Sequence, residues 1–348
     1  MTGRVRAADG VRRIEGKVRT MGPKTQLEAY LTQVRAGGQV GVVGSMNADY
    51  MVTAERFPQP GETIQGGTMS VLPGGKSGNQ AASAARLGAA VRLFGALGSD
   101  TNAEFLLDKL ADAGVGTGSI RRVAGPSGTT MITVDPHGEN TIVYSPGSNA
   151  TVDAGYIRSV SDDLLRCAVL GLCLESPMGA VQEAAQLCHE HGIPVLLNDS
   201  PFVSSLPADL VANTDILLVN EHEAAQLLGI AEPEDGNWAS ADWNAIADRL
   251  HRFGYDKAVI TLGAHGSMVI DGDHVAPVSA ISVDAVDATG CGDAFMGTIL
   301  AGLAAGLNLE DSANLASCVS AYAATGYGAQ ASYGSAEQIA DFIEQKVH

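Results

Sequence analysis

Short apolar runs alternate with amphipathic segments along most of the chain, and this alternation constrains the fold more than any other feature. After Gln39 the apolar runs fall at 40–43, 91–97, 168–174, 195–197, 216–219 and 258–262. Runs of this length are typical of strands in a parallel sheet, because both faces of such a sheet are covered. Segments with helical spacing lie between them, and several end at a glycine, such as Gly88, Gly192 and Gly229. The pattern predicts an α/β fold with a mostly parallel sheet and helices on both faces.

Two stretches, near 50–72 and 128–146, break the alternation. The first carries turn signals at Pro58, 60–61 and 66–67, and the second has the composition of a hairpin closed at 136–139. Both fit a small separate β-sheet better than helical crossovers of the main sheet. A small sheet attached to an α/β body is a candidate lid, which would exclude water from a site beneath it.

Residues 1–38 differ in composition from the rest of the chain. They contain eight Lys or Arg residues against three acidic residues, and no apolar run of a secretory signal. A basic organellar leader is an alternative that the absence of serine disfavours. We expect a flexible N-terminal extension, or a start assigned too early with Met21 as the alternative, followed by one domain over 39–348.

The charge of the chain narrows its possible partners. Lys and Arg number 21 against 39 Asp and Glu, a formal net charge of −18, so most of the surface repels nucleic acid and anionic membranes. The expected ligand is a small molecule, or an anion that brings a cation. No window holds the ~20 predominantly apolar residues of a membrane span. Five cysteines without a C-x-x-C pair argue against disulfides and structural zinc, and favour a reducing, cytoplasmic compartment.

Ligands of open parallel sheets collect at the carboxyl ends of the strands, and polar residues follow the first strand here. Asn47 and Asp49 are two positions apart, which places them on one side of an extended backbone. Amide and carboxylate groups together donate and accept hydrogen bonds, as the hydroxyls of a polyol require. A turn cap explains the same residues without any ligand.

A glycine turn over 74–80 leads into the next predicted helix. Its Gly-Lys-Ser triplet is not a Walker A loop, because that motif needs glycine at position 70, where the chain has Ser70. The G-x-G-x-x-G fingerprint of a dinucleotide site is also absent from the sequence. The turn is expected to expose Lys76 and Asn79 beside free helix amides, within reach of a hydroxylated ligand. An ordinary helix start is the alternative.

Two further strand ends carry acidic residues. Glu175 follows the run 168–174, where a solvated carboxylate is the simplest interpretation. Asn220 and Glu223 open a helix as a cap and an acidic first turn, which the helix dipole favours without any function. Their functional interpretation is a pair near the hydration shell of Mg²⁺, an ion that keeps several waters and needs few carboxylates.

The most specific segment is 287–295, Asp-Ala-Thr-Gly-Cys-Gly-Asp-Ala-Phe. Its glycines precede a long helix, expected over about 293–303, and leave the first N–H groups bare, which builds an anion site from backbone alone. A carboxylate at Asp293 would repel a bound phosphate. It is explained as a general base that removes a hydroxyl proton while the neighbouring amides stabilise a transferring phosphoryl group.

Six segments resemble, in the same order, those of ribokinases in the PfkB carbohydrate kinase family. They are 44–49, 74–81, 174–177, 220–223, 260–263 and 287–295, and the resemblance runs from about residue 40 to the C-terminus. It implies a ribokinase-like three-layer α/β/α fold with a small β-sheet lid that often mediates a homodimer. It also implies transfer of the γ-phosphoryl group of ATP to a sugar hydroxyl.

The resemblance further implies roles for individual residues. Asp293 would be the catalytic base, and the amides of Gly290, Cys291, Gly292 and Asp293 the anion hole. The residues that would line the sugar are Asn47, Asp49, Gly75, Lys76, Asn79, Glu175 and Asp293. The residues near the nucleotide would be Asn220, Thr261, Gly263 and Gly292, with Glu223 near Mg²⁺ and with Asp287 and Ser332 near a monovalent cation, usually K⁺.

Three departures from the family pattern bear on the substrate. Ser77 stands where glycine is usual, Cys291 stands where alanine is common, and 198–201 is Asn-Asp-Ser-Pro instead of Asn-Pro-Ala-Pro. The leading hypothesis is phosphorylation of the primary hydroxyl of ribose. The alternatives are another acceptor (deoxyribose, another pentose or hexose, or a nucleoside, which the scarcity of aromatics disfavours), and a catalytically silent sugar or nucleotide sensor.

Overall fold

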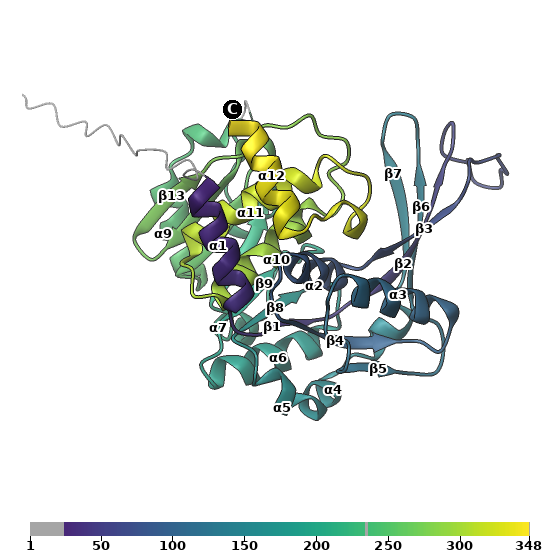
Figure 1. Cartoon of the computed structure of the whole chain (residues 1–348), viewed down its shortest axis with the longest axis horizontal. Helices are drawn as coiled ribbons and strands as arrows, with labels where there is room; N and C mark the ends of the chain where they lie inside the picture. Colours follow the sequence, from purple (N-terminus) through teal and green to yellow (C-terminus); the bar gives the residue numbers. More distant parts are fainter. Residues whose placement is uncertain (1–23, 234–235, 348) are drawn as a thin grey trace, which may run out of the picture.

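The computed structural model describes residues 24–233 and 236–347, and its main element is a large sheet (Figure 1). Within these residues nine strands join this sheet, and neighbouring strands pair in parallel except at β12, which is antiparallel to both β11 and β13. From one edge to the other they are β13 (His274–Val278), β12 (Ser267–Asp271), β11 (Lys257–Thr261), β10 (Ile216–Asn220), β9 (Val195–Asn198), β8 (Val169–Cys173), β1 (Val40–Val43), β4 (Val91–Leu97) and β5 (Ile120–Arg122). The prediction of a mostly parallel sheet is confirmed.

Helices cover both faces of the sheet and complete the three layers. On one face lie α1 (Lys24–Ala36), α2 (Lys76–Arg86), α3 (Thr101–Asp112), α10 (Cys291–Ala304), α11 (Leu309–Ala323) and α12 (Ala336–Val347). On the other lie α4 (Ala154–Ser159), α5 (Ser161–Leu164), α6 (Met178–Glu190), α7 (Ala208–Ala212), α8 (Glu221–Leu228) and α9 (Trp243–Phe253). Successive strand residues point to opposite faces, so Val169 and Leu170 of β8 enter two separate apolar clusters.

The order of the strands creates a switch point between β1 and β8. From β1 the sheet continues through β4 to β5, and from β8 it continues the other way through β9 to β13. The carboxyl ends of β1 and of β8 to β11 therefore meet at one edge. Ligands of such sheets bind in the crevice outside these ends.

A second, smaller sheet projects from this edge (Figure 1). Its strands are β3 (Ser70–Gly74), β2 (Asn47–Thr53), β6 (Gly128–Val134) and β7 (Asn140–Ser145), in that order. The predicted hairpin over 128–146 is the antiparallel pair β6 and β7. β2 starts only three residues after β1 ends, so the small sheet continues directly from the switch point.

The N-terminal prediction is wrong for residues 24–36, which form α1, whereas residues 1–23 lie outside the described part of the chain. The apolar residues of α1 follow helical spacing: Leu27, Tyr30, Leu31 and Val34. Each is at most 7% exposed and packs in the apolar cluster that contains Val169. The composition of residues 1–38 did not indicate this stripe, because most of the charged residues in that range lie before α1. Figure 1 shows α1 running beside α12.

The strand and helix signals of the sequence did not predict a helix after residue 308. Residues 309–323 are α11, and it packs closely on α10. All five cysteines lie within the described residues, and no disulfide joins any of them. Among the helices of the described ranges, none is long and apolar enough to cross a bilayer.

Leu27→Ala is expected to lower the free energy of unfolding by about 2–4 kcal/mol, because it leaves a cavity under α1. Urea unfolding followed by circular dichroism measures this cost. Glu28→Ala, on the exposed side of the same helix, is the matched control and should change stability by less than about 0.5 kcal/mol. Equal effects of the two substitutions would contradict the packing of α1.

Candidate active site

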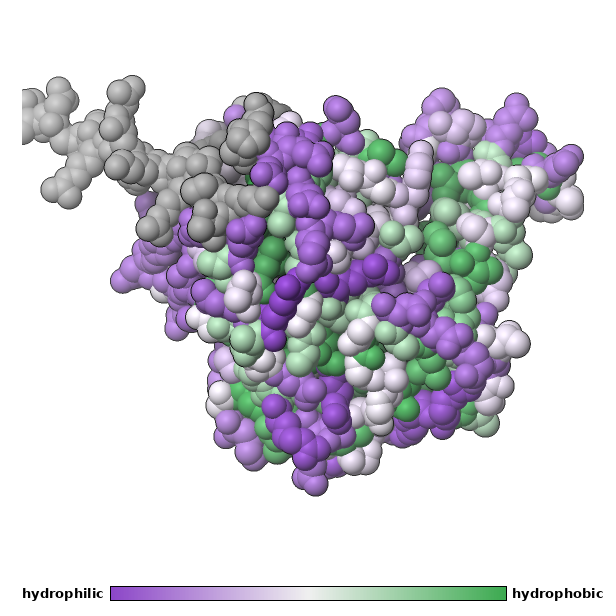
Figure 2. All heavy atoms as spheres, in the orientation of Figure 1, coloured by the Kyte–Doolittle hydropathy of each residue, from purple (hydrophilic) through white to green (hydrophobic). Residues whose placement is uncertain are grey.

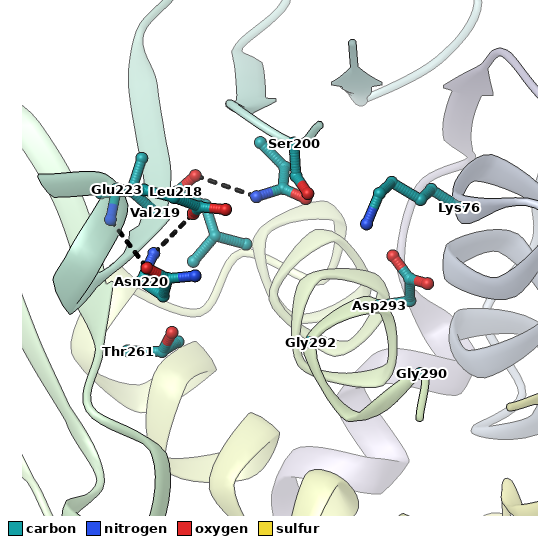
Figure 3. A pocket seen from close by; sticks show the side chains of 11 residues that line it. Lys76, Ser200, Leu218, Val219, Asn220, Glu223, Thr261, Gly290, Gly292 and Asp293 are labelled. Atoms are coloured by element: carbon teal, nitrogen blue, oxygen red, sulfur yellow. Dashed lines mark hydrogen bonds between the residues drawn. The ribbon is translucent and has the colours of Figure 1, made fainter. Parts of the chain in front are cut away.

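A cavity of about 220 Å³ lies at the carboxyl edge of the large sheet (Figure 3). The residues that line it come from the ends of β9 to β11 and the starts of α2, α8 and α10: Lys76, Asn198, Ser200, Leu218, Val219, Asn220, Glu223, Thr261, Gly290, Gly292 and Asp293. Figure 3 shows Lys76 and Asp293 at one end, and Asn220, Glu223 and Thr261 at the other. The fold thus brings together most of the residues predicted for the base, the anion hole and the nucleotide.

Three side-chain amides orient Asp293, which lies in the first turn of α10 and is 8% exposed. Nδ2 of Asn79 donates to its Oδ2 at 2.9 Å, and Nε2 of Gln80 donates to its Oδ1 at 3.1 Å. Gln330, in the 3₁₀ turn η4 (Gln330–Ser332), donates to Oδ1 of Asn79 at 3.0 Å. The carboxylate is therefore fixed, and Figure 3 shows Lys76 reaching toward it.

Burial raises the pKa of Asp293, although Lys76 and the donors Asn79 and Gln80 act against the rise. Burial by itself would lower the pKa of Lys76, but the carboxylates of Asp293, Glu175 and Glu223 raise it. A carboxylate with a raised pKa binds a proton more readily than an exposed one. Asp293 therefore has the orientation and the basicity of a general base, beside a cation that remains charged.

The start of α10 opens onto the cavity. Gly290 is the helix N-cap with φ = 76°, the left-handed conformation that favours glycine. Among the described residues, none accepts a hydrogen bond from the N–H groups of Gly290, Gly292 or Asp293. The N–H of Cys291 instead donates to the carbonyl of Ala288 at 3.2 Å. The open donors are thus fewer than the four amides expected from the sequence, because Cys291 closes the turn.

The start of α2 contradicts the prediction of free amides and exposed side chains. The N–H of Lys76 donates to Oε2 of Glu175 at 2.9 Å, and the N–H of Gly78 donates to the carbonyl of Ser45 at 3.0 Å. Asn79 is only 6% exposed and Lys76 is half-buried. The ends of β1 and β8 pack on this turn and satisfy it, so it cannot serve as a second anion site.

Glu175 joins the two sides of the switch point and is not a solvated carboxylate. Its Oε2 accepts hydrogen bonds from the Ser45 hydroxyl, after β1, and from the backbone of Lys76. Gly75 makes the close approach possible, because a Cβ there would lie 2.8 Å from the backbone N of Asn47. The three segments predicted to line the sugar are therefore in direct contact.

Asn47 and Asp49 lie on the same side of β2, as predicted from their spacing. Oδ1 of Asn47 accepts from Nδ2 of Asn149 at 2.8 Å, and Oδ1 of Asp49 accepts from the Thr130 hydroxyl. The register of the small sheet aligns Asp49 with Thr130 and with Tyr144 of β7. This row faces Glu175, whose charge acts on both Asp49 and Tyr144.

Ser77 is buried beneath the start of α2, although its position in the family's loop had suggested a bearing on the substrate. Its side chain is fully buried, and its hydroxyl donates to the carbonyl of Val43 at 3.1 Å and contacts Sγ of Cys173 at 3.3 Å. It ties the first turn of α2 to β1 and β8. This departure from the family pattern therefore bears on packing beneath the site.

Asn220 and Glu223 form a reciprocal capping box at the start of α8, as the cap prediction required. The Asn220 side chain accepts from the N–H of Glu223, and the Glu223 carboxylate accepts from the N–H of Asn220, each at 2.8 Å. Thr261 pairs with Asn220 at the end of the neighbouring strand, so both reach the cavity. Gly263 starts the 3₁₀ turn η3 (Gly263–His265) and is not part of the cavity wall.

Asp287 and Ser332 lie on adjoining loops beside the start of α10. Oδ1 of Asp287 accepts from the N–H of Thr289, and its Oδ2 accepts from the N–H of Gly328, both at 2.9 Å. Burial by itself would raise the pKa of Asp287, but these hydrogen bonds stabilise the carboxylate and lower the pKa below its usual range. The Ser332 hydroxyl donates to the carbonyl of Ala329 at 2.9 Å.

Several residues of the site were not identified from the sequence. Asn198 ends β9 and Ser200 follows it, so the rule for carboxyl ends could have placed them in the cavity. The sequence marked 198–201 only as a departure from the family pattern. Gln80, Asn149 and Gln330 have no such signal, because each comes close to the predicted residues only through tertiary packing.

Comparisons with known proteins show the family of the chain. The model of the pfkB family of carbohydrate kinases matches residues 38–335. The chain belongs to this family. It is 37% identical over 303 residues to the ribokinase of Schizosaccharomyces pombe, covering 84% of this chain and 94% of that one. It is 29% identical over 306 residues to the deoxyribokinase of Salmonella typhi, covering 87% and 98%.

A solved structure of a family member extends the likeness to three dimensions. The Arabidopsis thaliana ribokinase complexed with ribose and ATP has a TM-score of 0.81 and 27% identity, with 88% of this chain and 99% of that chain covered. The predicted ribokinase-like fold is therefore confirmed. As a pfkB kinase, the protein is a phosphotransferase that acts on an alcohol group of a carbohydrate.

Asp49→Asn is expected to stabilise the fold at neutral pH. Burial raises the pKa of Asp49 from 3.8 to about 6, against the hydrogen bond from Thr130. The pKa of Asp49 is higher in the folded than in the unfolded protein, so folding favours the neutral acid. The stability that this gives is present below pH 4 and is lost as the pH rises through 6. The variant should exceed the wild type by about 3 kcal/mol at pH 8, with a gap that closes toward pH 4.

Urea unfolding at several pH values measures this gap. Asp108→Asn, at an exposed site on α3, is the control and should show no gap at any pH. A gap for Asp49→Asn that does not change between pH 4 and pH 8 would contradict the assignment.

Proposed function

We propose that the protein transfers the γ-phosphoryl group of ATP to the primary hydroxyl of D-ribose, giving ribose 5-phosphate and ADP. The observation that carries the proposal is the position of Asp293, a buried carboxylate at the open start of α10. Asn79 joins it to the sugar-side residues, and the cavity on its other side extends to Asn220 and Thr261. The ribokinases among its relatives support ribose as the acceptor.

In this mechanism Asp293 takes the proton of the sugar hydroxyl as its oxygen attacks the γ-phosphorus. The bond from the γ-phosphorus to its bridging oxygen breaks, and the electron pair leaves with ADP. The open amides of Gly292 and Asp293, with Lys76, stabilise negative charge on the transferring group. Asn47, Asp49 and the other sugar-side residues hold the acceptor in line.

The residues around the cavity fit Mg²⁺ accompanying ATP, an ion that neutralises phosphate charge. The described residues contain no cluster of three His, Cys, Asp or Glu side chains able to hold a metal alone. Glu223 lines the cavity with one carboxylate, as expected for an ion held mainly by water and phosphate. The ionised Asp287 and the Ser332 hydroxyl supply oxygen ligands for K⁺, which would strengthen the anion hole from outside it.

A second acceptor, 2-deoxyribose, is favoured by the identity to a deoxyribokinase. Release of ADP from Mg-ATP, measured with ribose, deoxyribose, hexoses and nucleosides, with and without K⁺, tests the proposal. We expect the largest kcat/KM for ribose and a loss of activity without K⁺. A larger kcat/KM for any other acceptor would overturn the ribose assignment, and no turnover with any of them would support a silent sensor.

Asp293→Asn should lower kcat about 10²- to 10⁴-fold, because the amide cannot accept the hydroxyl proton, while ribose still binds. Coupled ADP assays give kcat, and calorimetry gives ribose affinity. Asp199→Asn is the matched control, since Asp199 is also a buried acid near the cavity but is held by the N–H of Val203. Normal turnover by the Asp293 variant would show that another group is the base.

We also propose that two copies of the chain dimerise through the small sheet. Its strands β6 and β7 carry exposed apolar side chains, among them Met131 at 58% and Val143 at 69%, which are cross-strand partners. Figure 2 shows apolar surface gathered over this part of the molecule. Isolated exposed apolar residues are common, but a contiguous row marks an interface.

Val143→Glu is expected to convert the dimer to a monomer, because it places a charge in an apolar contact. Light scattering after size exclusion measures the mass. Gln186→Glu introduces the same charge on the exposed surface of α6 and should leave the dimer intact. A dimer that survives both substitutions would exclude this interface.

A further inference from the structure

Tyr333 is a buried side chain that touches the start of α10. It is 3% exposed, and its hydroxyl donates to the carbonyl of Gly290 at 2.8 Å. Nothing in the sequence singles it out, since it follows Ser332 in a segment without charge. Its contact is with the residue whose conformation sets the direction of the amides that follow.

The peptide between Gly290 and Cys291 is held at both ends. Its carbonyl accepts from the N–H of Ala294 at 2.8 Å, as in any helix, and additionally from the Tyr333 hydroxyl. Its N–H donates to the carbonyl of Ala288 at 3.2 Å. The next two N–H groups, of Gly292 and Asp293, are the ones left open to the cavity.

Elsewhere in this turn the Ser320 hydroxyl donates to the carbonyl of Cys291 at 3.1 Å, and the N–H of Thr289 donates to Oδ1 of Asp287 at 2.9 Å. Residues 288, 289 and 292 are exposed, and a Cβ built on Gly292 would meet no atom within 4 Å. Gly290 is packed differently, because a Cβ there would lie 2.7 Å from the Tyr333 hydroxyl and 2.5 Å from Cβ of Ala329. Tyr333 and Ala329 are thus buried contacts of Gly290 itself, and of the two only Tyr333 donates a hydrogen bond to it.

We propose that Tyr333 is a positioning residue, whose hydroxyl fixes the Gly290 peptide so that the amides of Gly292 and Asp293 point at the transferring phosphoryl group. Donors in an active site stabilise developing charge only when they are oriented in advance. The Tyr333 hydroxyl is held in this position because the side chain is buried and its donor bond ends on the Gly290 carbonyl. This inference rests on the proposed phosphoryl transfer.

The test compares Tyr333→Phe with Tyr156→Phe. Tyr156 is a matched control, since it is 2% exposed and its hydroxyl donates to the carbonyl of Ser119 at 2.6 Å, away from the cavity. Each substitution removes a hydroxyl that donates to a backbone carbonyl. Both variants should therefore unfold at similar urea concentrations, slightly below that of the wild type. Only Tyr333→Phe should lower kcat, by about 10-fold, with KM for sugar and ATP within about threefold of the wild type.

A second measurement separates the transition state from substrate binding. Affinity for ADP with aluminium fluoride and sugar, which imitates the transferring group, should fall in Tyr333→Phe by the same factor as kcat, while affinity for ADP alone is unchanged. Hydrogen exchange of the peptide covering 288–296 should quicken in Tyr333→Phe and not in Tyr156→Phe.

Three results would overturn the proposal. The first is a kcat for Tyr333→Phe within twofold of the wild type, and the second is an equal loss of kcat in Tyr333→Phe and Tyr156→Phe. The third is failure of both Tyr333→Phe and Tyr333→Met to fold, because the contact would then be needed for folding. Absence of sugar phosphorylation by the wild type would instead refute the proposed function, so the two failures are distinguishable.

Discussion

A carboxylate buried at the start of α10 is the constraint on which the rest of the site depends. Removing a charge from water costs several kcal/mol unless donors and an opposite charge replace the water. Here two amides from α2 supply the donors, and Lys76 from the same helix supplies the charge. The first turn of α2 must therefore pack against the first turn of α10, and these helices are in extensive contact.

This packing explains why the two helix starts differ. At the start of α2, the N–H groups of Lys76 and Gly78 donate to Glu175 and Ser45. These hydrogen bonds hold that turn against the switch point of the sheet. The N–H groups of Gly292 and Asp293 have no acceptor among the described residues, so of these two helices only α10 begins with open donors. One turn is thus a rigid support, and the other carries the donors that it positions. Both begin at a glycine with positive φ, a likeness that conceals this difference.

The small sheet is part of the same arrangement. β2 follows β1 across a three-residue turn, so Asn47 and Asp49 lie beside the switch point while the remainder of the sheet projects. The cross-strand row from Asp49 through Thr130 to Tyr144 carries polar groups over the sugar side. Burial of Asp49 there raises its pKa, a destabilising feature that suits binding and not folding.

The sequence by itself determined the layered α/β fold, the hairpin of the small sheet and the principal polar residues, because strand periodicity, turn chemistry and strand ends are local properties. Only the tertiary structure decided which groups are satisfied. It buried Ser77 beneath the site, turned the N–H of Cys291 away from the cavity, and packed residues 24–36 as α1. Gln80, Gln330 and Tyr333 joined the site in the same way, since burial and hydrogen-bond partners depend on elements far apart in the chain, which spacing along a single segment does not record.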